Sequence, residues 1–246
     1  MMLKEGERLD DLQINGLKII QNARLYTFTS DSVLLANSVK ASPRTKAVDL
    51  CSGSGIVGIL LAGKLNAGRV DLVELQPSMC DMAERSVELN GLSDRVKVHN
   101  VSVQRAPEIL GKAAYDTAVC NPPYKKEGSG PDERPEHIRL ATTEIALTLK
   151  ETVAAAAELL KYGGRFYLIH RADRLAETAY ELSAAGLEPK KMTLIVPKAG
   201  KEPDTVIFEA VKGGKVGLKT SVITVYDESG NYTERVKQMY GAKESK

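Results

Sequence analysis

The segment from Ala47 to Leu61 constrains the fold of this chain more than any other feature of the sequence. It begins with an apolar run typical of a buried strand, continues through a turn of small residues and ends in an apolar stretch typical of a helix start. Gly53 and Gly55 lie in the turn, where a missing Cβ allows a tight bend and a close approach of the backbone to a ligand. The N–H groups of the following helix would point at this turn. The segment therefore predicts a strand, a ligand-binding loop and a helix.

Strand and helix patterns alternate along most of the chain. Strand patterns cover residues 46–50, 69–74, 95–100, 115–120 and 164–170, and helix patterns cover residues 55–66, 77–90, 102–110, 135–161 and 173–186. This alternation predicts an α/β fold with a parallel sheet. With 246 residues, 43% of them hydrophobic, the chain can bury the core of one sizeable globular domain.

Both ends of the chain carry turn signals. Residues 12–19 alternate around Asn15-Gly16, which predicts a hairpin, followed by a helix capped by Ser30 or Asp31. Strand patterns at residues 191–196 and 205–211 predict a terminal antiparallel hairpin. The tail from Thr220 predicts a turn and a short final helix, and three of its tyrosines have no evident role: Tyr226, Tyr232 and Tyr240.

The tetrapeptide Asn121-Pro122-Pro123-Tyr124 follows directly on the strand pattern of residues 115–120. Its two prolines fix φ and remove two backbone donors, so the strand must end there with its last carbonyl groups exposed. The Asn121 side-chain oxygen and the Pro122 carbonyl are two neutral acceptors, as the two hydrogens of a planar NH2 group require. The Tyr124 ring could stack on such a group. A stiff loop without chemistry is the alternative interpretation.

Glu74 is a second mark of a nucleotide-type site. It ends the strand pattern of residues 69–74, about 20 residues after the glycine turn, where an acidic side chain binds ribose hydroxyls in Rossmann-like sites. Its spacing and its place at a strand end both fit that function.

Together these segments resemble the class I S-adenosylmethionine-dependent methyltransferases, with the glycine motif at Asp49 to Gly55, the ribose acid at Glu74 and the amino-methyltransferase motif at Asn121 to Tyr124. Cys51 occupies the first small position of the glycine motif, which is commonly Gly in that superfamily. Within the superfamily the chain resembles the tRNA(Val) adenine-N6-methyltransferases, because residues 26–36 are also similar to theirs.

The resemblance implies a Rossmann-like sheet of seven strands, mostly parallel with an antiparallel terminal hairpin, and a short N-terminal hairpin extension. The implied organisation is a hairpin and helix at residues 1–40 packed on a class I methyltransferase domain at residues 41–246, as one globular unit. The implied cofactor is S-adenosyl-L-methionine.

Several expected cofactor residues also have plain structural interpretations. Asp49 either accepts the methionine ammonium or caps the next turn. Asn100, with the backbone of Val101, either contacts adenine or forms a turn. Phe28 and Asp31 either contact the cofactor or serve packing and capping. The expected cofactor-binding residues are Phe28, Asp31, Asp49, Ser52, Gly53, Ser54, Gly55, Glu74, Leu75, Asn100 and Val101.

Nitrogen methylation explains why the motif needs acceptors and no strong base. The exocyclic nitrogen of adenine is a poor nucleophile because its lone pair is conjugated with the ring. Acceptors at Asn121 and Pro122 would favour a tetrahedral nitrogen and stabilise its developing positive charge. With Tyr124 they are the expected catalytic residues, and the implied substrate is an unstacked adenine in RNA, in the anticodon loop of a tRNA.

Residues 125–135 are too polar and too rich in Gly and Pro for regular structure and predict a loop above the site. The expected substrate-binding residues are Pro123, Lys125, Lys126, Arg134, His137 and Arg139. Their basic side chains could meet RNA phosphates. A solvated loop of mixed charge is the alternative.

Composition excludes several classes of function. Lys and Arg total 34 against 32 Asp and Glu, a net charge of +2, so any RNA contact must be local. The three cysteines and three histidines are scattered, which predicts reduced thiols, a cytoplasmic location and no metal site. The N-terminus lacks an apolar leader, no segment is apolar enough for a membrane span, and no obligate protein partner is evident.

Other functions stay compatible with these motifs. A ribosomal RNA guanine methyltransferase carries a related motif. A protein glutamine methyltransferase shares it but usually has a separate N-terminal helical domain, for which the segment before the glycine motif is too short. A DNA adenine methyltransferase would need a target-recognition domain. A non-catalytic binding module with the cofactor fold would predict the loss of Asn121 or Glu74, and both are present.

Overall fold

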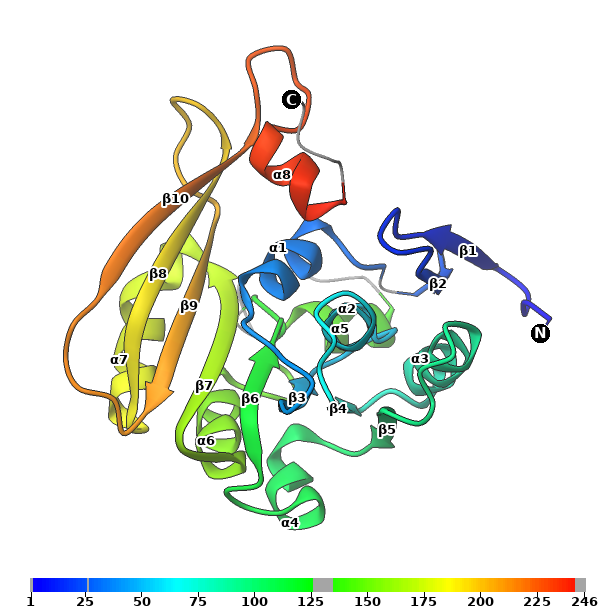
Figure 1. Ribbon diagram of the computed structural model, residues 1–246, viewed down its shortest axis with the longest axis horizontal. Coiled ribbons are helices and arrows are strands. Elements are labelled where there is room, and N and C mark those ends of the chain that lie inside the picture. The colour runs from blue at the N-terminus through cyan, green and yellow to red at the C-terminus, as the bar shows by residue number, and fades with distance from the viewer. Residues whose placement is uncertain (1, 26, 126–134, 242–246) are drawn as a thin grey trace.

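A computed structural model describes residues 2–25, 27–125 and 135–241 of the chain (Figure 1). Its centre is an eight-stranded sheet with the spatial order β10-β8-β9-β7-β6-β3-β4-β5. The strands are β3 (Lys46–Leu50), β4 (Arg69–Glu74), β5 (Val96–Asn100), β6 (Tyr115–Cys120), β7 (Leu160–Arg171), β8 (Leu187–Lys198), β9 (Thr205–Lys212) and β10 (Lys219–Tyr226). Strands β3 to β7 pair in parallel, whereas β9 runs antiparallel to both β7 and β8. The predicted α/β sheet with its antiparallel terminal hairpin is confirmed.

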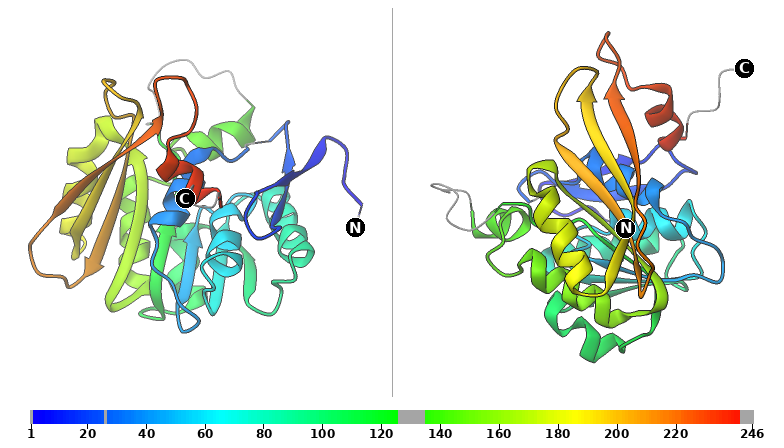
Figure 2. Two further views of the ribbon diagram at one scale, coloured as in Figure 1. Left: turned by 45° about the horizontal axis from the view of Figure 1, so that its top comes forward. Right: turned by 90° about the vertical axis from the view of Figure 1, so that its left-hand side faces the viewer.

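Helices cover both faces of this sheet (Figures 1 and 2). The helices on one face are α1 (Ser30–Ser38), α2 (Ile56–Gly63) and α3 (Pro77–Leu89), and those on the other are α4 (Ala106–Leu110), α6 (Leu149–Leu159) and α7 (Leu175–Ala184). Strand β7 shows why the strand patterns are almost continuously apolar. Tyr167 and Ile169 pack with the first group of helices, while Phe166 and Leu168 pack with the second.

The sheet has one strand more than the seven expected, because part of the C-terminal tail forms β10 and pairs in parallel with the edge strand β8. The predicted turn and final helix follow as α8 (Glu234–Met239). Tyr232 stacks on Tyr226 and on Tyr240, with ring centroids 5.2 and 5.3 Å apart. The ammonium of Lys64, the residue directly after α2, donates to the Met239 carbonyl at 2.7 Å, so the tail is fastened to the core.

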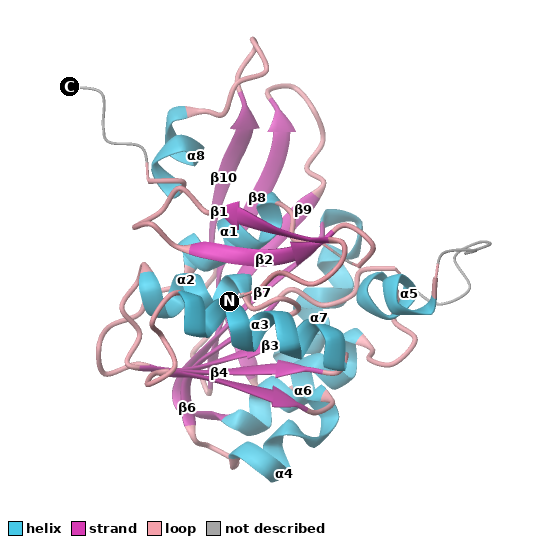
Figure 3. Ribbon diagram, turned by 90° about the vertical axis from the view of Figure 1, so that its right-hand side faces the viewer, coloured by secondary structure: helices cyan, strands magenta, loops and turns pink. Residues whose placement is uncertain are grey.

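The N-terminal hairpin is present, but its strands lie mostly outside the predicted residues 12–19. They are β1 (Glu7–Asp11) and β2 (Lys18–Asn22), set beside α3 and apart from the main sheet (Figure 3). Asn15 and Gly16 form the turn, with φ of 52° and 70°, as a tight hairpin turn of this sequence requires. The three apolar side chains of the connection are buried in the core that α2 and the sheet also share: Leu12, Ile14 and Leu17.

Two helix boundaries differ from the sequence patterns. The single helix predicted over residues 135–161 is two helices, α5 (Glu136–Thr142) and α6, because a turn intervenes and α6 begins with its own capping box of Thr148 and Glu151. The N-cap position of α1 belongs to Thr29, which places Ser30 and Asp31 inside the first turn. The predicted capping by Ser30 or Asp31 is therefore wrong.

Candidate functional site

The carboxyl ends of β3, β4 and β6 border a cavity of about 250 Å³. The chain runs outward from β3 through β4 to β5 and then crosses back to β6 on the other side of β3, and such a switch point is where open α/β sheets bind ligands. Twelve of the residues singled out from sequence line the cavity: Phe28, Asp49, Ser52, Gly53, Ser54, Glu74, Leu75, Asn121, Pro122, Pro123, Tyr124 and Lys125.

The glycine loop folds as its residue types require. Gly53 and Gly55 have φ of 55° and 89°, and the Gly55 N–H donates to the Ser52 carbonyl at 2.9 Å. Cys51 has φ of 58°, so this cysteine adopts the left-handed backbone that glycine would provide, at a cost of about 1–2 kcal/mol. Cys51, where the superfamily commonly has Gly, therefore adopts a strained backbone, and the loop still turns within one residue of β3.

Gly58 belongs to this motif, although the sequence patterns above do not single it out. With Gly53 and Gly55 it completes the spacing G-x-G-x-x-G, which is the signal that could have found it. A Cβ at Gly58 would lie 2.1 Å from Leu72 Cδ2 of β4. The third glycine therefore allows close packing of α2 on the sheet.

Glu74 holds a fixed carboxylate at the cavity wall. Its Oε2 accepts the Gly53 N–H at 2.9 Å, and its Oε1 accepts the Gln76 N–H at 2.8 Å. Burial raises the pKa of Glu74, and these backbone hydrogen bonds oppose the rise. The carboxylate links the glycine loop to the end of β4, where a ribose acid would act.

Asp49 is the second acidic group of the cavity and is 1% exposed. Its Oδ2 accepts the Gly58 N–H at 2.9 Å. Burial raises the pKa of Asp49 to about 8, the Gly58 hydrogen bond lowers it in part, and the charge of Glu74 raises it again. A cationic group beside Asp49 would stabilise the carboxylate and so lower the pKa of Asp49.

The donor set of the cavity fits S-adenosyl-L-methionine. The Ser52 hydroxyl is buried and has no hydrogen-bond partner among the described residues, although it lines the cavity. A buried polar atom of this kind is satisfied when a ligand supplies the partner. Two carboxylates, at Asp49 and Glu74, suit an ammonium group and ribose hydroxyls respectively.

Asn100 and Val101 lie beside the cavity without lining it. The Asn100 amide donates to the carbonyls of Glu74 and Leu75, at 3.1 and 2.9 Å, and so ties the end of β5 to the end of β4. The next residues, Ser102 to Gln104, line the cavity instead. The adenine contact expected at Asn100 and Val101 stays a prediction.

The Asn121 amide is held from both sides. Its Nδ2 donates to the Ser32 hydroxyl of α1 at 3.2 Å, and its Oδ1 accepts a short hydrogen bond from the Tyr124 hydroxyl. The same hydroxyl lies 3.4 Å from Asp31 Oδ2, and burial raises the pKa of Asp31. The hydroxyl of Tyr124 thus orients the acceptor of the motif, a contribution that the sequence patterns do not indicate.

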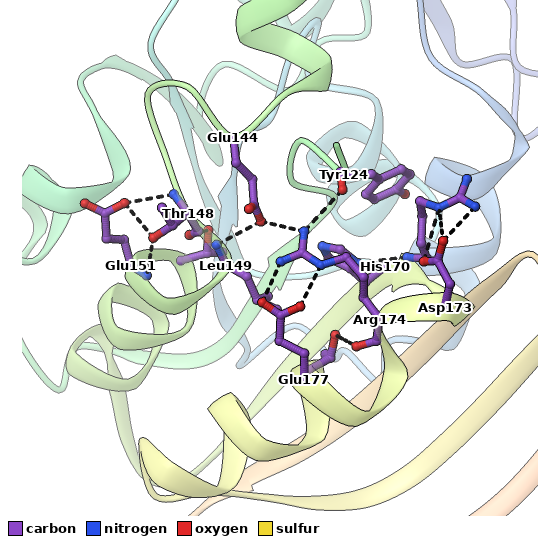
Figure 4. Close-up of polar contacts among 12 residues, drawn as sticks. Tyr124, Glu144, Thr148, Leu149, Glu151, His170, Asp173, Arg174 and Glu177 are labelled. Carbon is purple, nitrogen blue, oxygen red and sulfur yellow. Dashed lines mark hydrogen bonds and ion pairs between the residues drawn. The ribbon is translucent and has the colours of Figure 1, made fainter. Parts of the chain in front are cut away.

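Tyr124 is also anchored behind its ring and along its main chain (Figure 4). The ring packs on His170 with centroids 5.3 Å apart at an angle of 56°. His170 is fully buried, and burial lowers its pKa to about 4, so the imidazole is neutral. The Tyr124 carbonyl accepts a hydrogen bond from Arg174 at 3.2 Å.

The expected substrate-binding residues are only partly gathered at the cavity. Lys125 lines it, and α5 contributes Leu140 to Thr142. His137 is half-buried and its Nε2 donates to the Arg24 carbonyl at 2.8 Å, while Arg139 has a buried Nε without a partner among the described residues. Lys126 and Arg134 lie outside the described residues, as does Tyr26.

Other residues line the cavity without having been singled out. Gln76 and Met79 follow Glu74 at the start of α3, and Ser102 and Gln104 follow β5. All four lie in the connections or first helical turns that follow the carboxyl ends of β4 and β5, which was the available signal. Two more come from α1 and from the end of β7: Ser32 and Arg171. Nothing in the local sequence marks Ser32, which tertiary packing brings to the cavity. Arg171 follows directly on the strand pattern of residues 164–170, which marks it only as a weak candidate for phosphate contact.

The described residues include no helix that is both long and apolar enough to span a membrane. The same part of the chain holds no group of three His, Cys, Asp or Glu side chains arranged to bind a metal ion.

Comparison with known proteins identifies the family. A family model described as the methyltransferase small domain matches residues 27–185. The chain belongs to this family. It is an S-adenosyl-L-methionine-dependent methyltransferase, and the cavity between the glycine loop and the Asn121 motif is its candidate active site.

Two relatives of this methyltransferase carry different names. It is 27% identical to the tRNA1(Val) (adenine(37)-N6)-methyltransferase of Trichodesmium erythraeum over 206 aligned residues. The alignment covers 83% of this chain and 84% of the relative. It is 38% identical to the ribosomal protein uL3 glutamine methyltransferase of Bordetella pertussis over 84 aligned residues. This alignment covers 34% of this chain and 27% of the relative.

Solved structures confirm the fold. A predicted O-methyltransferase from Agrobacterium tumefaciens matches with a TM-score of 0.70 and 24% identity, covering 86% of this chain and 95% of that one. Geranyl diphosphate C-methyltransferase from Streptomyces coelicolor, solved with S-adenosyl-L-homocysteine, matches with a TM-score of 0.56 and 14% identity, covering 74% and 80%.

Proposed function

We propose that this methyltransferase methylates the exocyclic N6 of an unstacked adenine in RNA, in the anticodon loop of a tRNA. The observation that carries the proposal is the pair of neutral acceptors at Asn121 and Pro122, which line the cavity beside the glycine loop. The relatives named as tRNA1(Val) adenine-N6-methyltransferases, which match over most of the chain, support RNA as the substrate class. Three free cysteines are compatible with the reducing cytoplasm, where we place the reaction.

The chain's residues act on the amino group of the base. Asn121 Oδ1 and the Pro122 carbonyl accept its two N–H bonds and favour a tetrahedral nitrogen. Ser32 and the Tyr124 hydroxyl set the amide plane in advance, so little reorganisation is needed as charge develops. When bound, S-adenosyl-L-methionine supplies a methyl group already activated by its sulfonium. No general base is required at the moment of transfer, because the acceptors stabilise the cationic nitrogen until its proton leaves.

Tyr124 supplies the surface for the base. One side of its ring is covered by the neutral imidazole of His170, and the residue lines the cavity. Stacking of a base on an aromatic ring contributes about 1–3 kcal/mol. An adenine in a loop reaches this surface at low cost, because it is already unpaired.

The decisive experiment incubates the protein and labelled S-adenosyl-L-methionine with separate pools of tRNA, ribosomal RNA, DNA and protein extract, and then identifies the methylated species. We expect N6-methyladenosine in tRNA. Label on glutamine in protein would instead support the class of the Bordetella pertussis relative. Label on guanine in ribosomal RNA would support a ribosomal RNA guanine methyltransferase. An absence of label from all four pools would contradict the proposal.

On the methylated substrate, Asn121→Ala should lower kcat by roughly 10²–10³-fold, as for the loss of an oxyanion-hole donor, because the lost acceptor acts mainly in the transition state. Cofactor affinity, measured by calorimetry, should change much less. Asn90→Ala is the matched control, because the Asn90 amide is also hydrogen bonded, to the Lys18 and Ser86 carbonyls, but does not line the cavity. Near-normal turnover of Asn121→Ala would remove the amide from the mechanism.

A further inference from the structure

We propose that Arg174 is the positioning residue of the active site and that, paired with Glu144, it fixes Tyr124 where the substrate base stacks. The inference rests on the proposed function, since it assigns Tyr124 a part in binding the base. Arg174 does not itself line the cavity, so its effect must pass through the residues that it holds.

The contacts of Arg174 converge on three segments (Figure 4). Its Nη1 lies 3.2 Å from the Tyr124 carbonyl and 2.8 Å from Glu144 Oε1, and its Nη2 lies 2.9 Å from Glu177 Oε1. The Arg174 and Glu144 side chains are 10% and 9% exposed. A buried pair with these hydrogen bonds keeps one geometry, because few alternative partners or water molecules can replace it.

The chemistry of the motif explains why an arginine is needed there. Pro122 and Pro123 have no N–H, so this stretch of backbone offers mainly carbonyl oxygens to its surroundings. A side chain that anchors it must therefore donate hydrogen bonds. The guanidinium of Arg174 has donors for a carbonyl and two carboxylates at once, whereas a lysine ammonium is a single point charge on a flexible stem.

Glu144 extends the anchor to the other end of the segment that begins at Lys125. The Glu144 N–H donates to the Lys125 carbonyl at 2.7 Å, and the Lys125 N–H donates to the Thr142 carbonyl at 3.0 Å. Glu144 Oε1 also accepts the Leu149 N–H at the start of α6, at 3.1 Å. One ion pair thus joins the exit of β6, the return of the chain from α5 and the first turn of α6.

His170 supports the same residue from a second direction. Its ring packs on Tyr124, and its Nδ1 accepts the Arg171 N–H at 2.9 Å. Tyr124 is therefore fixed at its ring, at its hydroxyl and at its carbonyl. The carbonyl anchor is made by the charged guanidinium of Arg174, so substitution of Arg174 tests this contact separately from those at the ring and the hydroxyl.

The test is a double-mutant cycle on kcat/KM for RNA with Arg174→Met and Tyr124→Ala. Arg174→Met alone should lower kcat/KM by roughly 10–100-fold, as for a displacement of about 1 Å, with cofactor affinity within about twofold of wild type. In the Tyr124→Ala background the same substitution should have little further effect, because both changes remove one function. Additive losses in the cycle would overturn the proposal.

Arg85→Met is the matched control for loss of a buried arginine. Arg85 pairs with two carboxylates, Glu7 and Asp81, and is 16% exposed, but it joins β1 to α3 away from the cavity. It should lower the melting temperature as Arg174→Met does while leaving kcat/KM within about twofold of wild type. An equal loss of activity in both variants would assign Arg174 a merely structural effect.

Two further readouts decide the proposal if Arg174→Met folds poorly or if the wild-type protein does not methylate RNA. Arg174→Lys keeps the charge but not the forked guanidinium, and it should retain the fold. In the Arg174→Lys background, Tyr124→Ala should lower kcat/KM much less than it does in the wild type. Hydrogen exchange of the ligand-free protein should show faster exchange at the Lys125 and Glu144 amides in Arg174→Met and in Arg174→Lys, but not in Arg85→Met. Unchanged exchange would refute the anchor, whereas inactivity of the wild type on RNA would refute only the proposed function.

Discussion

Asp49 is a carboxyl group that the fold removes from water beside the glycine loop. Burial raises its pKa to about 8, so near pH 7 the carboxyl group is mostly protonated before a ligand binds. The ammonium of S-adenosyl-L-methionine needs the charged form as its partner. Binding should therefore lower the pKa of Asp49 and release a proton.

We expect cofactor binding at pH 7 to release a large fraction of one proton, and the release to vanish well above pH 8, where Asp49 is already ionised. Calorimetry in buffers of different ionisation enthalpy measures the proton count directly. Asp49→Asn should bind more weakly and with no proton release from this position. An equal proton count in wild type and Asp49→Asn would show that the ammonium lies elsewhere.

Helix α2 approaches β4 closely only because Gly58 has no Cβ. An added Cβ would lie 2.1 Å from Leu72 Cδ2, and Leu72 is fully buried and cannot swing away. Gly58→Ala should lower the free energy of unfolding by about 1–3 kcal/mol by overpacking, although alanine is the better helix former by about 1 kcal/mol. Urea unfolding measures the change.

Substitution of Leu72, the side chain that a Cβ at Gly58 would meet, provides the control for this prediction. Leu72→Ala should itself destabilise by leaving a cavity, but the double variant should lose less than the sum of the two, because the new methyl group fills part of that cavity. Strict additivity would mean that Gly58 and Leu72 do not limit the approach of α2 to the sheet.

Several boundaries at the scale of helices and strands depended on contacts that the local pattern does not contain. Thr148 and Glu151 have the spacing of a capping box. The helical pattern of residues 135–161 continues through both residues, so the pattern alone does not reveal the break between α5 and α6. The Asn15-Gly16 turn was readable, but the pairing of β1 with β2 begins farther out, because the apolar residues next to the turn are buried under α2.

The stability of the whole molecule should depend on pH through His170. Burial lowers its pKa from 6.5 to about 4, so between these values the unfolded chain binds more protons than the folded one. The free energy of unfolding should then rise with pH across this window, by about 2 kcal/mol from pH 4.5 to pH 7 for this residue.

The difference between wild type and His170→Gln isolates that contribution, because other titrating groups are common to both proteins. Urea unfolding at pH 4.5 and pH 7 should show a smaller rise for the variant. The neighbouring charges of Arg171, Asp173, Arg174 and Glu177 influence His170 and stay in place in the variant. Parallel pH profiles would indicate that His170 is hydrated or paired when it is protonated.

The sequence by itself determined the order of the strands from β3 to β9, the glycine loop and the motif at Asn121. These features depend on local rules: apolar periodicity, the φ that glycine allows and the donors that proline removes. Tertiary structure decided what local rules do not encode. It brought Ser32 to the Asn121 amide and Arg174 to the Tyr124 carbonyl, from positions far along the chain. It also raised the pKa of Asp49, because burial depends on what packs around a side chain and not on its neighbours in sequence.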